Sequence, residues 1–389
     1  MSEQYLNLPV APADTAFGLM AEYSADTHPN KVSLIAGTYR DENGLPWVLP
    51  SVKENHEYLG IAGSPALIKL DKSIASIQTV SGTGANHMAA QFLAQHLRPT
   101  RVFIPSPTWI NHRTIWASTG VSITDCPYYA PKTGTVDLNG MLDVLEHKAA
   151  ANDVVILQAC AHNPTGVDLS KAQWAQLAEV VKRKNLFVVF DSAYQGFATG
   201  DVDGDAWAVR YFVEELILTG RPDHPGLCVA QSFSKNFGLY GERVGALHLV
   251  VPSHLSAQGA RSQLLALARV EYSTPPRFGA SIVETILADG KLRAQWERDL
   301  GTMSARIKTM RRELRRRLEE KSVPGDWSFI ERQIGMFSYT GLGRDQVDRL
   351  RKEFHIYLLP SGRASICGLN EGNIEYVASA IGQVIRSGH

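Results

Sequence analysis

Three short apolar runs, each followed at once by polar residues, constrain the fold of this chain more than any other feature. The runs cover residues 154–157, 186–189 and 227–230, and each has the length and composition of a buried strand. In a parallel α/β sheet, the ends of such strands open onto the crevice where ligands bind. The residues that follow the three runs are therefore the first candidates for a functional site.

The segment after the third run carries an amine among anion-binding groups. Lys235 lies just beyond the strand end, with Ser232 and Ser234 before it and Arg243 eight residues after it. This setting suits imine formation between the lysine and a carbonyl cofactor, while the hydroxyls and the guanidinium hold the phosphate of that cofactor. A lysine in a loop rich in Gly and Ser is by itself more commonly solvated, so the other two strand ends decide the interpretation.

The second strand end carries Asp191. A carboxylate at the end of a buried strand is costly unless it meets a positive partner, and a protonated pyridine nitrogen is one such partner. The alternative is an Asp that caps the next turn, and for Asp191 taken alone the two explanations are equally good.

The first strand end leads into residues 162–166, His-Asn-Pro-Thr-Gly. Asn163 precedes a proline, which favours extended geometry and holds its amide out of the helical region. Gly166 then permits a turn, and residues 170–173 have the pattern of a capping box. The helix that follows is expected to bury the residues of one face, Trp174, Leu177, Ala178 and Val181. An isolated Asn-Pro pair is otherwise an ordinary turn signal.

A further anion-binding signal lies in residues 81–85, Ser-Gly-Thr-Gly-Ala. The glycines let backbone N–H groups approach an anion, and the helix expected after them points its positive end toward it. The pattern is less specific than a P-loop and gains weight only beside the other segments.

Composition argues against several classes of protein. The chain has 389 residues with 39 basic and 39 acidic side chains, so its charge does not indicate a nucleic acid or an anionic membrane as partner. The N-terminus lacks a basic region followed by an apolar stretch, so we expect a cytoplasmic protein. The four cysteines are far apart and show no CxxC spacing, which favours buried free thiols over a metal site.

Strands alternate with amphipathic helices from Trp47 to about residue 300. This order predicts an α/β fold with a mostly parallel sheet sandwiched by helices, accompanied by a smaller α/β domain. We expect residues 1–46 to join the small domain, 47–302 to form the large domain and 303–389 to form the small C-terminal domain. The arginine-rich run 311–317 contains a glutamate and predicts a solvated helix face rather than a nucleic-acid site.

The three loop motifs SFSKNFG (232–238), FDSAYQGF (190–197) and HNPTG (162–166) resemble those of the class I aminotransferases of the pyridoxal-phosphate fold-type I group. The chain is similar to the aspartate aminotransferase subfamily, and the resemblance extends from Ala16-Phe17 to residues 358–363, nearly the whole chain. It implies a fold-type I large domain, pyridoxal 5'-phosphate (PLP) as cofactor, and a homodimer with shared active sites.

The resemblance also implies a role for each candidate residue. Lys235 would hold the cofactor as an internal aldimine and, once freed, move the α-proton of the substrate, with Asp191 and Tyr194 as the other catalytic residues. His112 would lie behind Asp191 and keep it ionised, so that the pyridine nitrogen stays protonated. The matching cofactor-binding residues are Ser81, Gly82, Thr83, Trp109, Asn163, Asp191, Tyr194, Ser232, Ser234, Lys235 and Arg243, with Tyr58 reaching the phosphate of the partner subunit.

Two arginines carry the expected substrate specificity. By resemblance, Arg363 grips the α-carboxylate of the substrate with its guanidinium fork, and Arg269 binds a distal carboxylate across the dimer interface. Gly37, Trp109 and Asn163 complete the implied substrate-binding set. The expected reaction is the PLP-dependent transamination of L-aspartate with 2-oxoglutarate, which yields oxaloacetate and L-glutamate in amino acid metabolism.

The chain departs from the subfamily pattern at several positions. Residues 50–81 are shorter than usual by about two short helices, Gln158 replaces a usual histidine, Thr274 replaces a usual asparagine, and residues 240–242 resemble the aromatic-preferring branch. Three alternatives therefore stay open. They are an aminotransferase that accepts aromatic amino acids, a PLP enzyme of altered chemistry (elimination, decarboxylation or carbon–carbon bond formation) on an acidic amino acid, and a catalytically idle binding protein. The intact candidate catalytic residues argue against the last.

Overall fold

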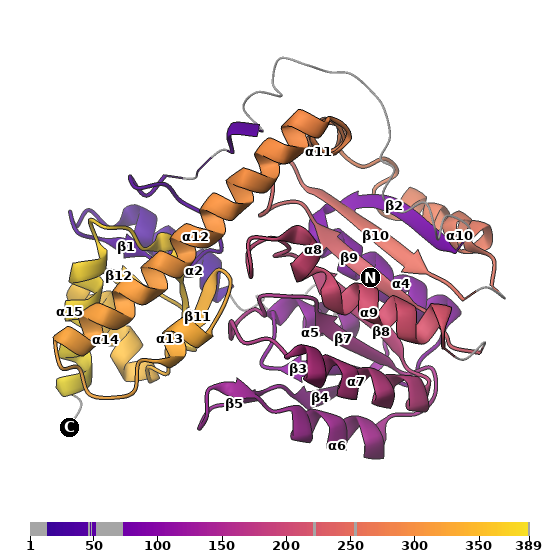
Figure 1. Ribbon diagram of the computed structural model, residues 1–389, viewed down its shortest axis with the longest axis horizontal. Coiled ribbons are helices and arrows are strands. Elements are labelled where there is room, and N and C mark those ends of the chain that lie inside the picture. Colours follow the sequence, from indigo (N-terminus) through magenta and orange to yellow (C-terminus); the bar gives the residue numbers. More distant parts are fainter. Residues whose placement is uncertain are drawn as a thin grey trace, which may run out of the picture.

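A seven-stranded sheet forms the centre of the larger lobe (Figure 1). The computed structural model describes residues 14–45, 47, 49–51, 73–220, 223–252 and 255–387. β10 pairs antiparallel with both of its neighbours and the remaining pairs are parallel, which confirms the mostly parallel sheet. The order along the sheet is β2 (Ile74–Val80), β10 (Val244–Val250), β9 (Leu227–Ser232), β8 (Phe187–Ser192), β7 (Val154–Gln158), β3 (Arg101–Ser106) and β4 (Ser122–Pro127).

Helices cover both faces of this sheet. One face packs against α4 (Ser81–His96), α5 (Ile110–Ala117) and α10 (Ala257–Glu271), and the other against α6 (Leu138–Lys148), α7 (Lys171–Lys184) and α9 (Trp207–Val213). In β7, Val155 and Leu157 belong to one buried cluster, whereas Val154 and Ile156 belong to the other. Strands that are buried on both sides show up in the sequence as unbroken apolar runs.

The helix expected after the capping-box pattern is confirmed. The Ser170 side chain accepts from the Gln173 N–H group, and the Gln173 side chain accepts from the Ser170 N–H group. Both hydrogen bonds of the capping box are therefore present. The buried face of α7 contains the expected residues, Trp174, Leu177, Ala178 and Val181. The shorter elements of the larger lobe are β5 (Tyr129–Ala130), β6 (Thr135–Val136), α8 (Val202–Asp205), the π-helix η3 (Glu214–Leu218) and α11 (Phe278–Ala288).

The smaller lobe brings segments from the two halves of the chain together (Figure 1). β1 (Val32–Ser33), which follows the helix α2 (Thr15–Ala25), pairs in parallel with β12 (Ile356–Tyr357). A second pair, β11 (Phe337–Tyr339) with β13 (Arg363–Ser365), is antiparallel. The helices of this lobe are α13 (Phe329–Arg332), α14 (Arg344–Phe354), the 3-10 turn η4 (Ile366–Gly368) and α15 (Ile374–Arg386).

One long helix connects the lobes. α12 (Gly290–Glu320) begins beside α11 and runs into the smaller lobe (Figure 1). Its buried residues, among them Trp296, Leu300 and Leu314, belong to a core cluster that also contains residues of both lobes. Residue 302, the expected end of the large domain, lies inside this helix. The division of the chain at residues 46 and 302 stays a prediction.

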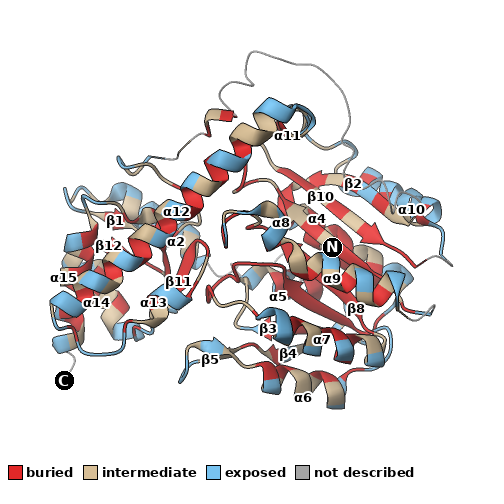
Figure 2. Cartoon of the chain, in the orientation of Figure 1, coloured by how far each residue is buried: buried red, intermediate tan, exposed pale blue. Residues whose placement is uncertain are grey.

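Burial follows this layered architecture (Figure 2). The central strands β7 and β8 are buried along their whole length, whereas the covering helices expose one face. The four cysteines are buried free thiols, as expected. In the described ranges, no helix combines the length and the hydropathy that crossing a membrane requires.

The loop after β7 fits closely against the smaller lobe. Gly166 has a φ of +66°, and a Cβ at this position would lie 2.5 Å from the carbonyl oxygen of Phe337. The carbonyl oxygen of Gly166 accepts from the N–H group of Ile334 at 2.7 Å. Glycine is therefore required here both for the turn and because no side chain fits between the two segments.

One expectation about α12 is wrong. Arg311, assigned with its neighbouring arginines to a solvated face, is only 2% exposed. Its guanidinium donates hydrogen bonds to the carbonyl oxygens of Ile330, Gly335 and Phe337. The other arginines of the run are at least partly exposed. The charge pattern of the helix does not reveal the difference, because the partners of Arg311 are backbone groups of the later segment from α13 to the start of β11.

We expect Arg311→Leu to lower the free energy of unfolding by roughly 3 kcal/mol or more, because three buried carbonyl groups lose their donor. The matched variant Arg312→Leu, on the exposed face of the same helix, should change it by less than ~0.5 kcal/mol. Urea denaturation followed by tryptophan fluorescence measures both. Equal losses in the two variants would show that the Arg311 contacts do not stabilise the fold.

Candidate active site

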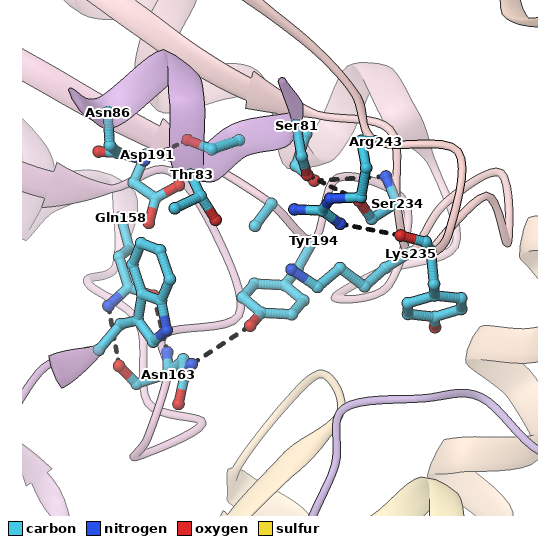
Figure 3. A pocket seen from close by; sticks show the side chains of 15 residues that line it. Ser81, Thr83, Asn86, Gln158, Asn163, Asp191, Tyr194, Ser234, Lys235 and Arg243 are labelled. Carbon is cyan, nitrogen blue, oxygen red and sulfur yellow. Dashed lines mark hydrogen bonds between the residues drawn. The ribbon is translucent and has the colours of Figure 1, made fainter. Parts of the chain in front are cut away.

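The polar residues at the strand ends meet in one cavity (Figure 3). It has a volume of about 150 Å³ and lies at the carboxyl-terminal ends of β7, β8 and β9. Its lining comes from the segments that follow these strands, from the start of α4 and from the loop after β3. The lining residues are Ser81, Gly82, Thr83, Asn86, Trp109, Gln158, Asn163, Asp191, Ala193, Tyr194, Ser232, Ser234, Lys235, Tyr240 and Arg243.

One end of the cavity suits an anion. The Ser81 N–H group donates to the carbonyl oxygen of Arg243 at 3.0 Å, and α4 has no side-chain cap for the N–H groups that follow, which leaves its N-terminus suited to an anion. The hydroxyl oxygens of Ser81 and Ser234 lie 2.9 Å apart at this end, and the guanidinium of Arg243 points toward them (Figure 3). Hydroxyls, a guanidinium and a helix N-terminus together form the chemistry of a phosphate site.

Lys235 lies next to this anion-binding end. Its Nζ is 5.0 Å from the centre of the Tyr194 ring (Figure 3), and it makes no ion pair within the part of the chain that the structure describes. Burial lowers the pKa of Lys235 below its ordinary value of 10.5; the Asp191 carboxylate opposes this shift, and the Arg243 guanidinium adds to it. Lys235 therefore holds the neutral, nucleophilic form of the amine more readily than an exposed lysine does.

Asp191 supplies the negative group of the cavity. It is 6% exposed and belongs to β8, and its Oδ2 lies 2.9 Å from Nε2 of His112 in α5. His112 is itself buried, so the contact expected between these two residues is present. A hydrogen-bond donor from the imidazole offsets part of the cost of a buried carboxylate, and a cationic ligand nitrogen would offset the rest.

Asn163 connects Tyr194 to Arg363 of the smaller lobe. Its Nδ2 donates to the Tyr194 hydroxyl at 3.3 Å, and its Oδ1 accepts from Arg363 Nη1 at 3.2 Å. Arg363 also donates to the carbonyl oxygen of Ile35 at 2.5 Å and lies over the Phe337 ring, 4.3 Å from its centre. Burial raises the pKa of Tyr194 and lowers that of Arg363. Arg363 has no carboxylate partner among the described residues, so it is ready to bind one from a ligand.

The remaining candidates lie at the edge of the cavity or away from it. Gly37 lies against Phe337, since a Cβ on Gly37 would be 2.7 Å from the tip of that ring. Arg269 is exposed near the end of α10, where it donates to the Ser273 hydroxyl, and it does not line the cavity. Tyr58 lies outside the described residues. The structure thus brings together every cofactor-binding candidate except Tyr58, and it keeps Arg269 apart.

Four lining residues are not among the sequence-predicted site residues: Asn86 and Ala193 are missed, and Gln158 and Tyr240 are named only as departures from the subfamily pattern. Asn86 lies one turn after Gly82 on α4 and donates to its carbonyl oxygen at 3.0 Å, so helical spacing from the glycine could have found it. Ala193 lies between two candidates in the sequence, Asp191 and Tyr194. The Tyr240 hydroxyl accepts from the N–H group of a residue about two hundred positions earlier, Tyr39, which no local pattern reveals.

The chemistry of the lining fits pyridoxal 5'-phosphate. That molecule carries a phosphate, an aldehyde and a pyridine nitrogen, and the cavity offers an anion-binding end, a buried amine and a carboxylate. Within the described ranges, no group of three or more His, Cys, Asp or Glu side chains is placed to hold a metal ion. A PLP-type cofactor therefore matches the residues present.

Known proteins resemble this chain over nearly its whole length, and residues 29–381 match the family described as aminotransferase class I and II. The cytoplasmic aspartate aminotransferase of Saccharomyces cerevisiae is 43% identical over 409 residues, which cover 98% of this chain and 96% of that protein. The structure titled aspartate aminotransferase from Saccharomyces cerevisiae cytoplasm has a TM-score of 0.93 and 42% identity, with all of both chains covered.

Two further relatives carry other names. The L-tyrosine:2-oxoglutarate aminotransferase of Aspergillus ustus is 44% identical over 403 residues, covering 95% of this chain and 76% of that protein. The structure of the aromatic-amino-acid aminotransferase of Burkholderia pseudomallei, described as covalently bound to pyridoxal phosphate, has a TM-score of 0.89 and 38% identity, with 99% and 100% of the two chains covered.

We expect the pH midpoint for the reaction of Lys235 with an aldehyde to lie below 10.5 in the protein freed of cofactor, because burial lowers the pKa of this amine. Asp191→Asn should lower the midpoint further by removing the opposing charge, and Arg243→Gln should raise it. Borohydride trapping over a pH series, with the Lys235 peptide quantified by mass spectrometry, measures the midpoints. Shifts of both variants in the same direction would refute this account of the electrostatics.

Proposed function

This chain belongs to the class I and II aminotransferase family, and we propose that it transfers the amino group of L-aspartate to 2-oxoglutarate. The products are oxaloacetate and L-glutamate. As a member of this family the chain is PLP-dependent and acts on an amino acid and a 2-oxo acid. The choice of aspartate as amino donor is supported by the two arginines of the candidate substrate site and by the name of the yeast relative.

One observation carries the proposal: a single cavity holds Lys235 together with Asp191 and the anion-binding end formed by Ser81, Ser234 and Arg243. These side chains come from segments spread over more than 160 residues of sequence. A packed core does not need a buried amine and a buried carboxylate at the same place, so a ligand that requires both explains them better.

When bound, PLP supplies a carbonyl group for the amino donor and a protonated ring that withdraws electrons from the substrate's α-carbon. Lys235 would hold the aldehyde through Nζ. Once the amino donor has taken its place, the free amine would act as the general base that accepts the α-proton of the substrate, and its ammonium form as the general acid that gives the proton back. Its lowered pKa suits this task, because the neutral amine is the form that accepts a proton. Asp191, hydrogen-bonded to His112, would hold the proton on the pyridine nitrogen.

The α-carboxylate of the substrate is assigned to Arg363. Its guanidinium already lies beside Asn163 and is held flat by the Phe337 ring, so it presents a fixed fork to a carboxylate. Gly37 lets the backbone pack against the tip of the Phe337 ring, where a Cβ would lie only 2.7 Å away. Trp109, in the cavity wall, is assigned to the face of the cofactor ring, and Asn163 and Tyr194 to its ring oxygen.

We assign Arg269 to the distal carboxylate of the substrate in the active site of a second copy. It is exposed and lies outside the cavity of its own chain. Next to it Val270 is 85% exposed, and Ile110 at the start of α5 is 71% exposed. A homodimer is the arrangement in which Arg269 reaches substrate, and exposed apolar side chains such as these are available for such a contact. Tyr58 would complete the phosphate site there.

An aminotransferase that also accepts aromatic amino acids is the second candidate. It is favoured by the 44% identical relative named as an L-tyrosine:2-oxoglutarate aminotransferase and by Tyr240, which lines the cavity. Altered PLP chemistry gains no support, because the relatives compared are named aminotransferases. A cytoplasmic location is favoured by the yeast relative that carries the word cytoplasmic in its name.

The reaction itself is tested with the purified protein loaded with PLP. Incubation with L-aspartate alone should convert the bound cofactor to its pyridoxamine form, seen by absorbance, with one equivalent of oxaloacetate seen by mass spectrometry. Adding 2-oxoglutarate should then restore the first absorbance and release L-glutamate. Loss of carbon dioxide or release of ammonia in place of oxaloacetate would contradict the proposed transamination.

Lys235→Ala should lower turnover with L-aspartate and 2-oxoglutarate by a factor on the order of 10⁴ or more, because it removes the group that binds the aldehyde and moves the proton. The exposed Lys132→Ala serves as the control and should keep normal turnover. A coupled assay for oxaloacetate measures both. If the turnover of Lys235→Ala stays within tenfold of the wild-type value, the role assigned to Lys235 is wrong.

Arg269→Asp should lower kcat/KM for L-aspartate by about 100-fold or more, since it removes a charge-assisted pair and adds repulsion. The value for L-tyrosine should fall far less. Arg261→Asp, exposed on the same helix, makes the same charge change without reaching substrate and should leave both values near wild type. An unchanged L-aspartate value in Arg269→Asp would favour the aromatic-accepting alternative.

A further inference from the structure

Gln158, at the end of β7, links Asn163 to Asp191 through a chain of hydrogen bonds. Its Oε1 accepts from the Asn163 N–H group at 2.8 Å, and its Nε2 donates to the Asn163 carbonyl oxygen at 2.9 Å. The same Nε2 lies 3.1 Å from Oγ1 of Thr108, and that oxygen lies 3.0 Å from Nδ1 of His112. Nε2 of His112 then contacts Asp191 at 2.9 Å.

The two ends of this chain fix its direction. A backbone N–H group only donates and a backbone carbonyl only accepts, so Asn163 determines which atom of the Gln158 amide is oxygen and which is nitrogen. The second proton of Nε2 therefore points at Thr108. At the other end the Asp191 carboxylate accepts, so Nε2 of His112 carries a proton.

Thr108 decides the state of the remaining nitrogen. Its hydroxyl group has a single proton, and Gln158 already donates to one of its lone pairs, so that proton is free to point at Nδ1 of His112. If Nδ1 carried a proton instead, His112 would be a buried cation, and the Thr108 proton would have no acceptor among the described residues. Among the described groups, every donor of this chain of hydrogen bonds has an acceptor when Nδ1 carries no proton.

We propose that Gln158 is a positioning residue that, through Thr108, keeps His112 neutral and protonated on Nε2. In that state the imidazole donates one hydrogen bond to Asp191 without adding a positive charge. The full charge of the carboxylate is then available to the pyridine nitrogen of the cofactor. This inference rests on the proposed function and deepens it. An imidazolium would share that charge and weaken the hold on the ring proton.

The direct test is the state of His112 in the PLP-loaded protein labelled with ¹⁵N-histidine. Two-bond ¹⁵N–¹H spectra at neutral pH separate the two neutral tautomers and the cation by their nitrogen shifts, and His112→Asn identifies the signal. We expect the pattern of a neutral ring protonated on Nε2. A ring protonated on Nδ1, alone or with Nε2, overturns the proposal, and this measurement needs no variant of Gln158.

Two variants test whether Gln158 sets that state. In Gln158→Glu the carboxylate only accepts, so the Thr108 proton turns toward it and Nδ1 of His112 faces a lone pair; we expect the imidazolium pattern. Gln158→Met neither donates nor accepts, so Thr108 loses the donor that fixes its orientation and Nδ1 of His112 loses the proton directed at it; we expect the Nδ1-protonated or imidazolium pattern to appear beside the neutral Nε2 pattern. A merely structural role predicts no change of protonation in either variant, and that result would overturn the proposal.

The matched control is Gln173→Glu, in the capping box of α7, which makes the same charge change and should leave the His112 spectrum unchanged. We expect kcat for L-aspartate to fall about 10- to 100-fold in Gln158→Glu, the range for loss of an orienting partner. If the wild-type His112 ring is neutral and protonated on Nε2 but no oxaloacetate forms, the proposed function fails and the positioning role stands. If oxaloacetate forms but the ring is cationic, only the positioning role fails.

Discussion

A carboxylate in the interior of an α/β sheet is the constraint on which the rest of this site depends. Asp191 lies in the central strand β8 at 6% exposure, where desolvation alone would be prohibitive. Parallel neighbours on both sides of β8 carry their own polar residues to the same edge, so partners can approach from β7 and β9. His112, on a helix packed over one face, supplies a donor from behind. What remains is an open acceptor aimed into a cavity, and a cationic ring nitrogen satisfies it.

Local patterns in the sequence predict a large part of this arrangement. Strands buried on both faces must be apolar throughout, so their ends, and the polar residues just beyond them, can be found without the fold. Asn163, Asp191 and Lys235 are all located in this way, and a capping box predicts α7 down to its buried face. The resemblance of the loop motifs to those of a known family predicts which cofactor binds. Neither source depends on knowing which segments meet in space.

The parts that escape prediction depend on distant backbone. Arg311 belongs by charge pattern to a solvated face, yet it is buried and donates to three carbonyl groups between α13 and β11. Gln158 is visible only as an unusual residue, because its function depends on the direction of a chain that passes through Thr108 and His112. Arg269 is a different case. It lies outside the cavity of its own chain, so its assigned role in specificity depends on the proposed homodimer.

The two lobes meet at the place where a substrate carboxylate is assigned. Arg363 begins β13 in the smaller lobe, and Asn163 follows β7 in the larger one, so their hydrogen bond crosses the boundary. Phe337 presses on the guanidinium from one side, and its carbonyl oxygen is held by Arg311 of the helix that both lobes share. The geometry of the guanidinium therefore depends on α12 and on the loop that Gly166 fits against. Arg311, which donates to the backbone of Phe337, and Arg363, to which the substrate carboxylate is assigned, are in this way connected through one residue.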